Sequence, residues 1–314
     1  NGLYNNSKIW SKVIKTMNSK VTIVSGGDSG YFDLLKELLA SLKKLNLSEN
    51  FEISFLDGGL KNTEKSYFNS MGASVLDPGW PDKISKLRAG RKEFLKVEVA
   101  KAHLDQLFPH SEHIIWIDAD AWLQNAEALK IMLTITSKNK LAIYSQASRL
   151  QEHHIQYKKI FGPIVILRNA LFKTAIKGGL SKNIKNSLIA RPTLNAGIFA
   201  LRTNAPHWKK LKIWQKKLLN NPRIRIFSTT QLALGIISYH EKMPFEPLPE
   251  ICNYMGPYRW SSKSNLFTHI YAPYEPISII HMAGLKEIRE NRLHTIEVID
   301  ENDNIINTSL RFKL

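Results

Sequence analysis

The chain has 314 residues, of which 44 are Lys or Arg and 27 are Asp or Glu, and its formal net charge is +17. Hydrophobic residues make up 43% of it and charged residues 23%, a composition that excludes a disordered or fibrous protein. Apolar runs such as 114–117 are far shorter than the ~20 residues of a bilayer-crossing helix, so we expect no membrane span. The single cysteine, Cys252, excludes an intrachain disulfide and a cysteine-based zinc cluster.

The positive charge favours anionic partners, but it does not choose among nucleic acid, acidic lipid and phosphate-bearing substrates. Segment 207–219 carries apolar residues at helical spacing and five lysines on the other side. Such a helix either packs its apolar side into the core, which we favour, or lies on an anionic membrane surface. Single-cysteine usage is typical of a reducing compartment. We therefore expect a cytoplasmic protein, with peripheral contact at the inner face of a bacterial membrane through 207–219 and the lysine-rich stretch 141–193.

The first half of the chain alternates strands with helices. Short β-branched runs predict strands at 21–25, 51–56, 73–76 and 114–117, and apolar periodicity predicts helices at 31–45, 63–71 and 92–107. Strands that alternate with helices form parallel β-α-β units. We therefore expect a doubly wound sheet with ligands at the carboxyl ends of its strands.

The second half predicts strands at 194–201 and 277–281 and helices at 208–219 and 229–239. Residues 141–193 hold several short apolar runs and many basic residues, and we interpret them as an insertion. Neither an internal repeat nor a low-complexity linker divides the chain. The expected organisation is an N-terminal helical extension over 1–20, one α/β domain over 21–287, and a C-terminal hairpin or tail over 288–314.

Two carboxylates follow the apolar strand at 114–117. In extended backbone, residues two apart point to the same side, so Asp118 and Asp120 converge at the strand end. Such a pair binds a divalent cation, and a cation that bridges two phosphates neutralises a departing nucleoside diphosphate. His281 ends another predicted strand and completes a site suited to Mn²⁺, or to Mg²⁺. Gly284, just beyond it, lets the backbone approach a phosphate closely.

Six short motifs occur in an order that resembles one enzyme family. They are VTIVSGGDSGY, FLDGGL, WIDADAWLQN, LNAGIFALR, LPEICN and HMAG. In these motifs the chain is similar to the retaining sugar transferases of glycosyltransferase family 8, which includes glycogenin and bacterial lipopolysaccharide galactosyl- and glucosyltransferases. The resemblance implies a GT-A fold, a Rossmann-like single domain with a mixed central sheet.

The resemblance also implies roles for individual residues. It implies a UDP-sugar donor, a saccharide or glycolipid acceptor, and a Mn²⁺ or Mg²⁺ ion held by Asp118, Asp120 and His281. The nucleotide would be held by Gly26, Gly27, Asp28, Tyr31, Lys96, Ala119, Gly284 and Lys286. The donor sugar would be contacted by Asn195, Ala196, Gly197, Thr230 and Gln231, with Asn195 and Gln231 as the catalytic pair.

Two positions depart from the family pattern. Thr230-Gln231 stands where the family has Asp-Gln, so the acidic group that holds a donor-sugar hydroxyl is replaced by a neutral one. Glu287 stands where the family has a lysine six residues after the histidine, and Lys286 or Arg289 would then supply the phosphate-binding charge.

Two other classes of protein remain as alternatives. Nucleotidyltransferases share the strand-loop-helix core, but SGGDSGYF lacks their Gly-rich signature with Arg and Lys. A non-catalytic binder of anions or nucleic acid would suit the net charge. The chain, however, has no helix-turn-helix, zinc or RNA-recognition signature, so we expect no nucleic-acid partner.

Overall fold

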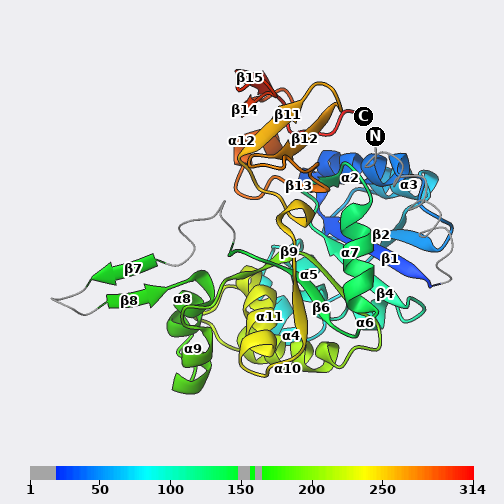
Figure 1. The fold of residues 1–314 in the computed structure, drawn as a ribbon. Helices are drawn as coiled ribbons and strands as arrows, with labels where there is room; N and C mark the ends of the chain where they lie inside the picture. The colour runs from blue at the N-terminus through cyan, green and yellow to red at the C-terminus, as the bar shows by residue number, and fades with distance from the viewer. Residues whose placement is uncertain (1–18, 148–155, 160–164) are drawn as a thin grey trace.

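The computed structural model describes residues 19–147, 156–159 and 165–314, and a mixed seven-stranded sheet forms the centre of this part of the chain (Figure 1). Across the sheet the strands are β10 (Phe245–Leu248), β6 (Leu141–Ser145), β9 (Leu194–Arg202), β4 (His113–Ile117), β1 (Val21–Gly27), β2 (Phe51–Asp57) and β3 (Ser74–Leu76). β1 runs parallel to β2 and β4, whereas β9 is antiparallel to both β4 and β6. The predicted α/β fold with one mixed central sheet is confirmed.

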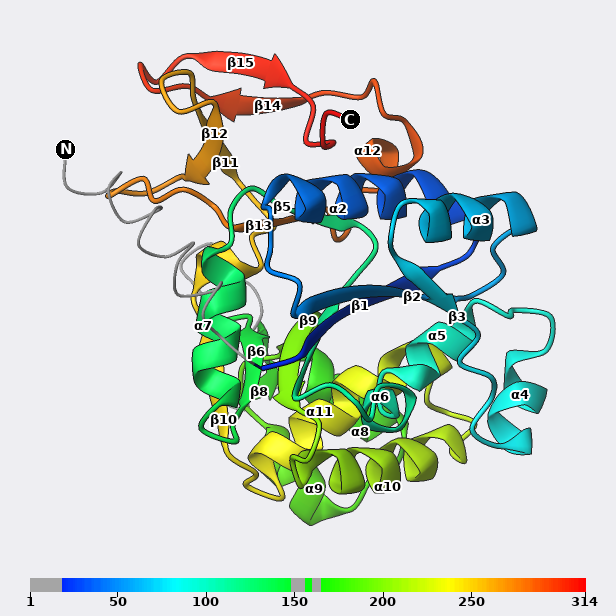
Figure 2. The same cartoon turned by 90° about the vertical axis from the view of Figure 1, so that its right-hand side faces the viewer.

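Helices cover both faces of this sheet (Figure 2). One face packs against α2 (Phe32–Lys44), α3 (Asn62–Ser70) and α7 (Glu127–Thr136). The other packs against α5 (Leu95–Ala100), α6 (Leu104–Leu107), α8 (Ala170–Lys177), α9 (Lys182–Leu188), α10 (His207–Leu219) and α11 (Thr229–Tyr239). Along β4, Ile115 and Ile117 belong to the first core and Ile114 and Trp116 to the second, as the two-residue period of a strand requires.

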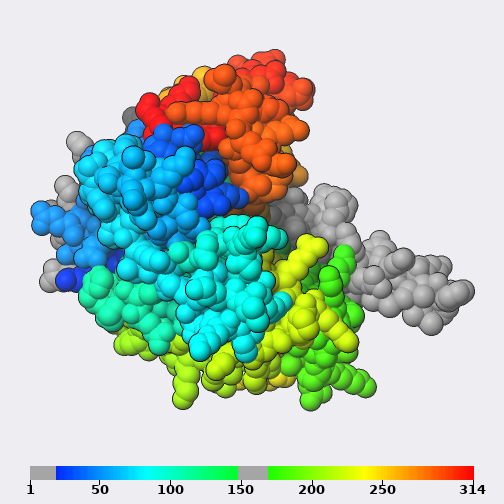
Figure 3. Space-filling model, turned by 180° about the vertical axis from the view of Figure 1, so that it is seen from behind, coloured from blue at the N-terminus to red at the C-terminus, as the bar shows by residue number. Residues whose placement is uncertain are grey.

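The C-terminal part forms a smaller layer against α2. It contains η3 (Glu250–Cys252), the four-stranded sheet β12 (Leu266–His269), β11 (Tyr258–Ser261), β14 (Ile296–Ile299) and β15 (Ile305–Thr308), and the short helix α12 (Lys286–Glu290). A separate antiparallel pair joins β5 (Ala121–Leu123) to β13 (Ile279–His281). Figure 3 shows this layer, in orange and red, seated on the blue and cyan N-terminal half.

The structure differs from the predicted elements in several places. The helix expected at 92–107 is broken into α5 and α6, because Ala102 and His103 make tight i→i−3 bonds to Val99 and Ala100. Residues 141–193 are not wholly an insertion, since β6 lies inside the central sheet; β7 (Gln156–Lys159) and β8 (Val165–Arg168) form a hairpin that extends from the body in Figure 1. α4 (Lys83–Ala89) has no counterpart among the predicted helices.

The remaining predictions concern the two ends of the chain and the membrane. β14 and β15 pair as an antiparallel hairpin within 288–314. The helical extension expected at 1–20 falls almost entirely on residues 1–18, which lie outside the described part. In the described part, no helix combines the length and the apolar character that a membrane crossing requires.

Candidate active site

Three side chains from distant parts of the sequence meet at the carboxyl end of β4. Asp118 and Asp120 follow β4 directly, and His281 ends β13, where it pairs with Ala121 of β5. One ligand atom of each residue lies within 4.8 Å of the others. Two carboxylates and one imidazole are a ligand set that suits Mn²⁺, which accepts both oxygen and imidazole nitrogen.

The hydrogen bonds of His281 orient its ring toward the carboxylates. Nδ1 lies 2.7 Å from Asn253 Oδ1, which only accepts, so Nδ1 carries the proton. Nε2 then faces Asp120 Oδ1 at 3.3 Å. Metal-binding histidines commonly donate their other N–H to an oxygen in this way. The imidazole is therefore set to present Nε2 as a metal ligand.

The charges of Asp120 and His281 stabilise each other. Burial opposes ionisation of Asp120, but His281 and Arg289 outweigh it and hold the pKa of the carboxyl below its usual range. Burial likewise disfavours protonated His281, yet Asp120 and then Asp118 raise the pKa of the imidazole. A buried carboxylate and imidazole that face each other at 3.3 Å require a cation between them, either a proton or a metal ion.

Strand β9 closes one side of this cluster with almost no space to spare. A Cβ added to Gly197 would lie 2.6 Å from His281 Cε1 and 2.8 Å from Asp118 Oδ2. The backbone N–H of Gly197 donates to Asn195 Oδ1 at 2.8 Å, and its carbonyl accepts from the N–H of Asp118 at 2.8 Å. The glycine therefore allows β9 to lie against the metal-ligand cluster, and Asn195 lies beside it.

A buried network of charged residues contacts the side chain of Asp118. Lys101, at the end of α5, lies 2.9 Å from Asp118 Oδ1 and 2.9 Å from Glu98 Oε2. Trp116 Nε1 donates to the same Asp118 oxygen at 2.7 Å. Burial lowers the pKa of Lys101, but Asp118 and Glu98 outweigh it, so the net pKa is raised and the ammonium stays charged. These contacts fix the orientation of the Asp118 side chain.

The loop after β1 reaches the same edge of the sheet. Asp28 Oδ1 accepts from the N–H of Gly30 and begins the turn η1 (Ser29–Tyr31). The hydroxyl of Tyr31 lies 3.4 Å from Arg289 Nη1. Burial raises the pKa of Tyr31, Arg289 lowers it and the nearby carboxylates raise it, so the net pKa is raised. Gly26 has no room for a side chain, because a Cβ there would lie 2.8 Å from the carbonyl oxygen of Leu56. The structure thus brings the predicted nucleotide loop to the metal-ligand cluster.

Two lysines predicted to bind the nucleotide form ion pairs with residues outside the metal-ligand cluster. The ammonium of Lys96 pairs with Asp77 at 2.9 Å, beside a pocket of about 560 Å³, and Lys101 instead contacts Asp118. Lys286 is exposed and lies 3.7 Å from Glu290.

The hydroxyl of Thr230 forms its hydrogen bonds inside the protein. The buried hydroxyl of Thr230 donates to the Glu98 carbonyl at 3.0 Å and accepts from Gln215 at 3.1 Å. Gln231, next on α11, is half-buried. Ala119 and Ala196 are buried, and Gly284 is exposed with a φ of +80°, which favours glycine.

The sequence motifs assigned no role to Lys101 or Asn253, and they gave Arg289 only as an alternative to Lys286 for the phosphate-binding charge, yet the structure places all three at the site. Lys101 and Asn253 contact Asp118 and His281, respectively. Arg289 Nη1 lies 3.0 Å from Asp120 Oδ2. Lys101 and Lys96 both lie in the helix expected at 92–107. The sequence alone does not show which of the two lysines reaches Asp118, because that depends on how the chain folds. Asn253 lay inside the LPEICN motif without a stated function.

Comparisons with known proteins give similar structures. No family model matches the chain, and no curated protein matches it. The bifunctional glycosyltransferase WbbM is similar to it at 13% identity and a TM-score of 0.49; the match covers 86% of this chain and 46% of WbbM. The galactosyltransferase LgtC, solved with donor and acceptor sugar analogues, matches at 12% identity and a TM-score of 0.49, over 84% of this chain and 87% of LgtC. GlyE of Streptococcus pneumoniae matches at 14% identity and a TM-score of 0.45, over 76% and 47%.

Proposed function

We propose that the protein is a metal-dependent glycosyltransferase that moves a hexose from a UDP-sugar to a hydroxyl group of a saccharide acceptor. The observation that carries this proposal is the convergence of Asp118, Asp120 and His281 beside Gly197 and the loop after β1. A ligand cluster at the carboxyl ends of the strands of an α/β sheet is where such folds bind nucleotides. The sequence motifs that contribute these residues favour the same function.

The donor set fits a divalent ion. Asp118, Asp120 and His281 would hold Mn²⁺ or Mg²⁺, which when bound neutralises the charge on the departing nucleoside diphosphate. Lys101 and Trp116 fix the Asp118 carboxylate, and Asn253 fixes the His281 ring. These partners hold the ligands in place before the substrate arrives, which is the arrangement that makes electrostatic stabilisation effective.

The remaining residues of the site would bind the donor. Asp28 and Tyr31 lie at the same strand edge, where they would hold the uridine and ribose. Asn195 and Gln231 would place oxygen atoms near the anomeric carbon and stabilise its developing positive charge. In the transfer, the bond from the anomeric carbon to the diphosphate oxygen breaks, a bond to the acceptor oxygen forms, and the proton of the acceptor hydroxyl passes to the departing diphosphate. Retention of configuration follows from the family resemblance in the motifs.

A panel of donors tests the reaction. The protein is incubated with UDP-glucose, UDP-galactose and their N-acetyl forms in the presence of Mn²⁺, and release of UDP is measured with and without saccharide acceptors. We expect UDP release from at least one donor and an acceptor-dependent increase. Proton NMR of the first-formed product reports its anomer. An inverted anomer from an α-linked donor would exclude retention, and no UDP release from any donor would count against the activity.

A further inference from the structure

Arg289 occupies part of the predicted metal site. Its Nη1 lies 3.0 Å from Asp120 Oδ2, while the other oxygen of the same carboxylate faces His281 at 3.3 Å. The guanidinium also lies 3.4 Å from the Tyr31 hydroxyl, at the end of the loop after β1. A fixed positive charge therefore stands between the predicted metal ligands and the predicted nucleotide loop.

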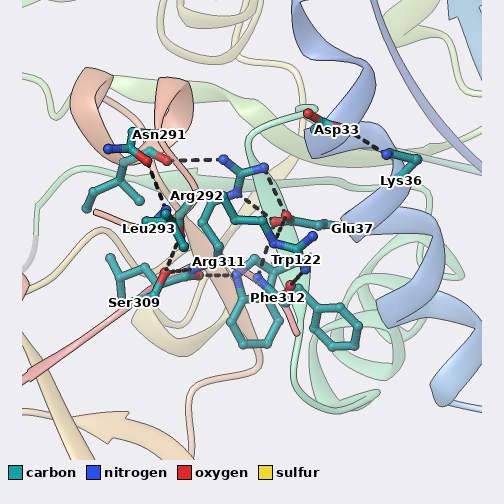
Figure 4. Close-up of polar contacts among 12 residues, drawn as sticks. Asp33, Lys36, Glu37, Trp122, Asn291, Arg292, Leu293, Ser309, Arg311 and Phe312 are labelled. Atoms are coloured by element: carbon teal, nitrogen blue, oxygen red, sulfur yellow. Dashed lines mark hydrogen bonds and ion pairs between the residues drawn. The ribbon is translucent and has the colours of Figure 1, made fainter. Parts of the chain in front are cut away.

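The last residues of the chain hold Arg289 in this place. Arg311 Nε and Nη2 pair with the buried Glu37 of α2 at 2.7 and 2.9 Å (Figure 4). Arg311 Nη1 donates to the backbone carbonyls of Ile288 and Arg289 at 3.2 and 3.0 Å. The buried pair thus ties α12 to α2, and the backbone of Arg289 is fixed by a contact that does not involve its side chain.

The Arg289 side chain has unused capacity to donate hydrogen bonds. It is 25% exposed, and its Nε is buried without a partner among the described residues. A guanidinium presents its N–H groups in a planar fork that matches phosphate oxygens. Lys286, the other cation on α12, cannot replace it, because Lys286 pairs with Glu290 on the outer surface.

The position of this charge makes the two predicted ligands interdependent. A divalent ion at Asp120 would lie close to the guanidinium, and the two positive charges would repel each other. A diphosphate that contacts both cations removes this repulsion and adds attraction to each. A metal ion that binds without the anion must therefore compete with Arg289 for the Asp120 carboxylate. A metal ion that binds together with the anion does not have to compete.

We propose that Arg289 couples binding of the divalent metal to binding of a diphosphate anion. Arg289 competes with the metal for Asp120 when the anion is absent, and it contacts the anion when the anion is present. This inference rests on the proposed function, because it concerns the same metal site. The coupling is reciprocal, so the diphosphate raises the affinity for metal by the same factor as metal raises the affinity for diphosphate.

Binding of Mn²⁺, measured by equilibrium dialysis as the excess of metal in the protein compartment, with any pyrophosphate at equal concentration on both sides, tests the coupling without turnover. The full chain and its Arg289→Gln variant are titrated with Mn²⁺ alone and with saturating pyrophosphate. For Arg289→Gln we expect tighter binding of Mn²⁺ alone and a coupling factor reduced by ~10-fold or more. Arg289→Lys keeps the charge and should retain part of the coupling. Lys313→Gln removes one exposed charge from the C-terminal segment without contact to Asp120 or Glu37, so it should behave as the parent.

The outcomes separate this inference from the proposed function. An unchanged coupling factor in Arg289→Gln would overturn the role of Arg289 and leave the metal site standing. Weaker binding of Mn²⁺ alone in that variant would also overturn it, since competition predicts the opposite sign. If the parent binds no Mn²⁺ with or without pyrophosphate, the proposed function itself fails.

Discussion

At the level of single residues, the hydrogen bonds of the His281 imidazole determine whether it can bind a metal ion. Its Nδ1–H donates to the buried Asn253, which leaves Nε2 facing Asp120. Because the amide oxygen of Asn253 selects the tautomer, it determines whether His281 can ligate a metal ion with Nε2.

We therefore predict that Asn253→Leu, which is similar in size but cannot accept this hydrogen bond, weakens binding of Mn²⁺ in the presence of UDP by about 10–100-fold. Asn253→Asp keeps an oxygen acceptor and should stay much closer to the parent. Equilibrium dialysis of Mn²⁺ measures both variants, and thermal unfolding shows whether each is folded. Equal affinities for parent and folded Asn253→Leu would show that the ring is oriented by something else.

The residues of the site differ in how far they could be predicted. Asp118, Asp120 and His281 each follow an apolar run, so their place at a strand end is visible in the sequence. Lys101 and Arg289 act on Asp118 and Asp120 through space, and their contacts depend on where α5 ends and how α12 is anchored. Local sequence patterns do not encode either contact.

At the scale of elements, the turn after β2 shows how one side chain shapes a loop at the nucleotide edge. Asp57 Oδ1 accepts from the N–H groups of Gly59 and Leu60, each at 2.8 Å, and Oδ2 pairs with Lys65 at 3.0 Å. Burial raises the pKa of this carboxyl, but the hydrogen bonds from Leu60 and Gly59 and the contact with Lys65 outweigh it. The net pKa is lowered from 3.8.

Because the folded-state pKa is below the unfolded value, the stabilisation by ionised Asp57 is complete above the unfolded pKa and is lost as pH falls through the folded one. We predict that Asp57→Asn lowers the free energy of unfolding by ~1 kcal/mol at pH 7. The difference from the parent should shrink as the pH falls below 3.8. Urea unfolding at several pH values measures it, and a difference that grows on acidification would contradict the assigned role.

The elements themselves were predictable where the hydrophobic period is regular. Strand β4 is buried on both faces and reads as a continuous apolar run, and α2 has a clear apolar side. The break between α5 and α6 escapes such reasoning, because Val97, Ala100 and Leu104 keep one apolar period across it and pack into the same core. The short α4 buries only Ser85 and Ala89, so its pattern carries little signal.

At the scale of the whole molecule, the net charge of +17 is divided between paired and exposed cations. On α10, Lys210 pairs with Glu241 and Lys212 with Asp105, whereas Lys209 and Lys216 are exposed. The apolar side of α10 is buried in the core, so this helix cannot insert it into a bilayer. A contact with an anionic membrane would therefore depend on the exposed lysines of α10, such as Lys209 and Lys216.

We predict that the protein sediments with vesicles of anionic lipid and not with vesicles of neutral lipid at low salt. Replacing Lys209 and Lys216 with Gln should weaken this binding by ~1 kcal/mol for each lysine. Lys43 and Lys44 end α2, on the opposite face of the sheet, and their double Gln variant is the charge-matched control. Equal loss in both variants would show that binding follows net charge and not this surface.

The proposed function requires Asp120 to belong to a metal site that binds the diphosphate of UDP. Isothermal titration calorimetry of UDP, with Mn²⁺ and with chelator, tests it most directly in the parent and in Asp120→Asn. We predict that the parent binds UDP tightly only with Mn²⁺, and that the folded variant loses this dependence because one charged ligand is gone. Binding of UDP by Asp120→Asn with the same dependence on Mn²⁺ as the parent would contradict the account.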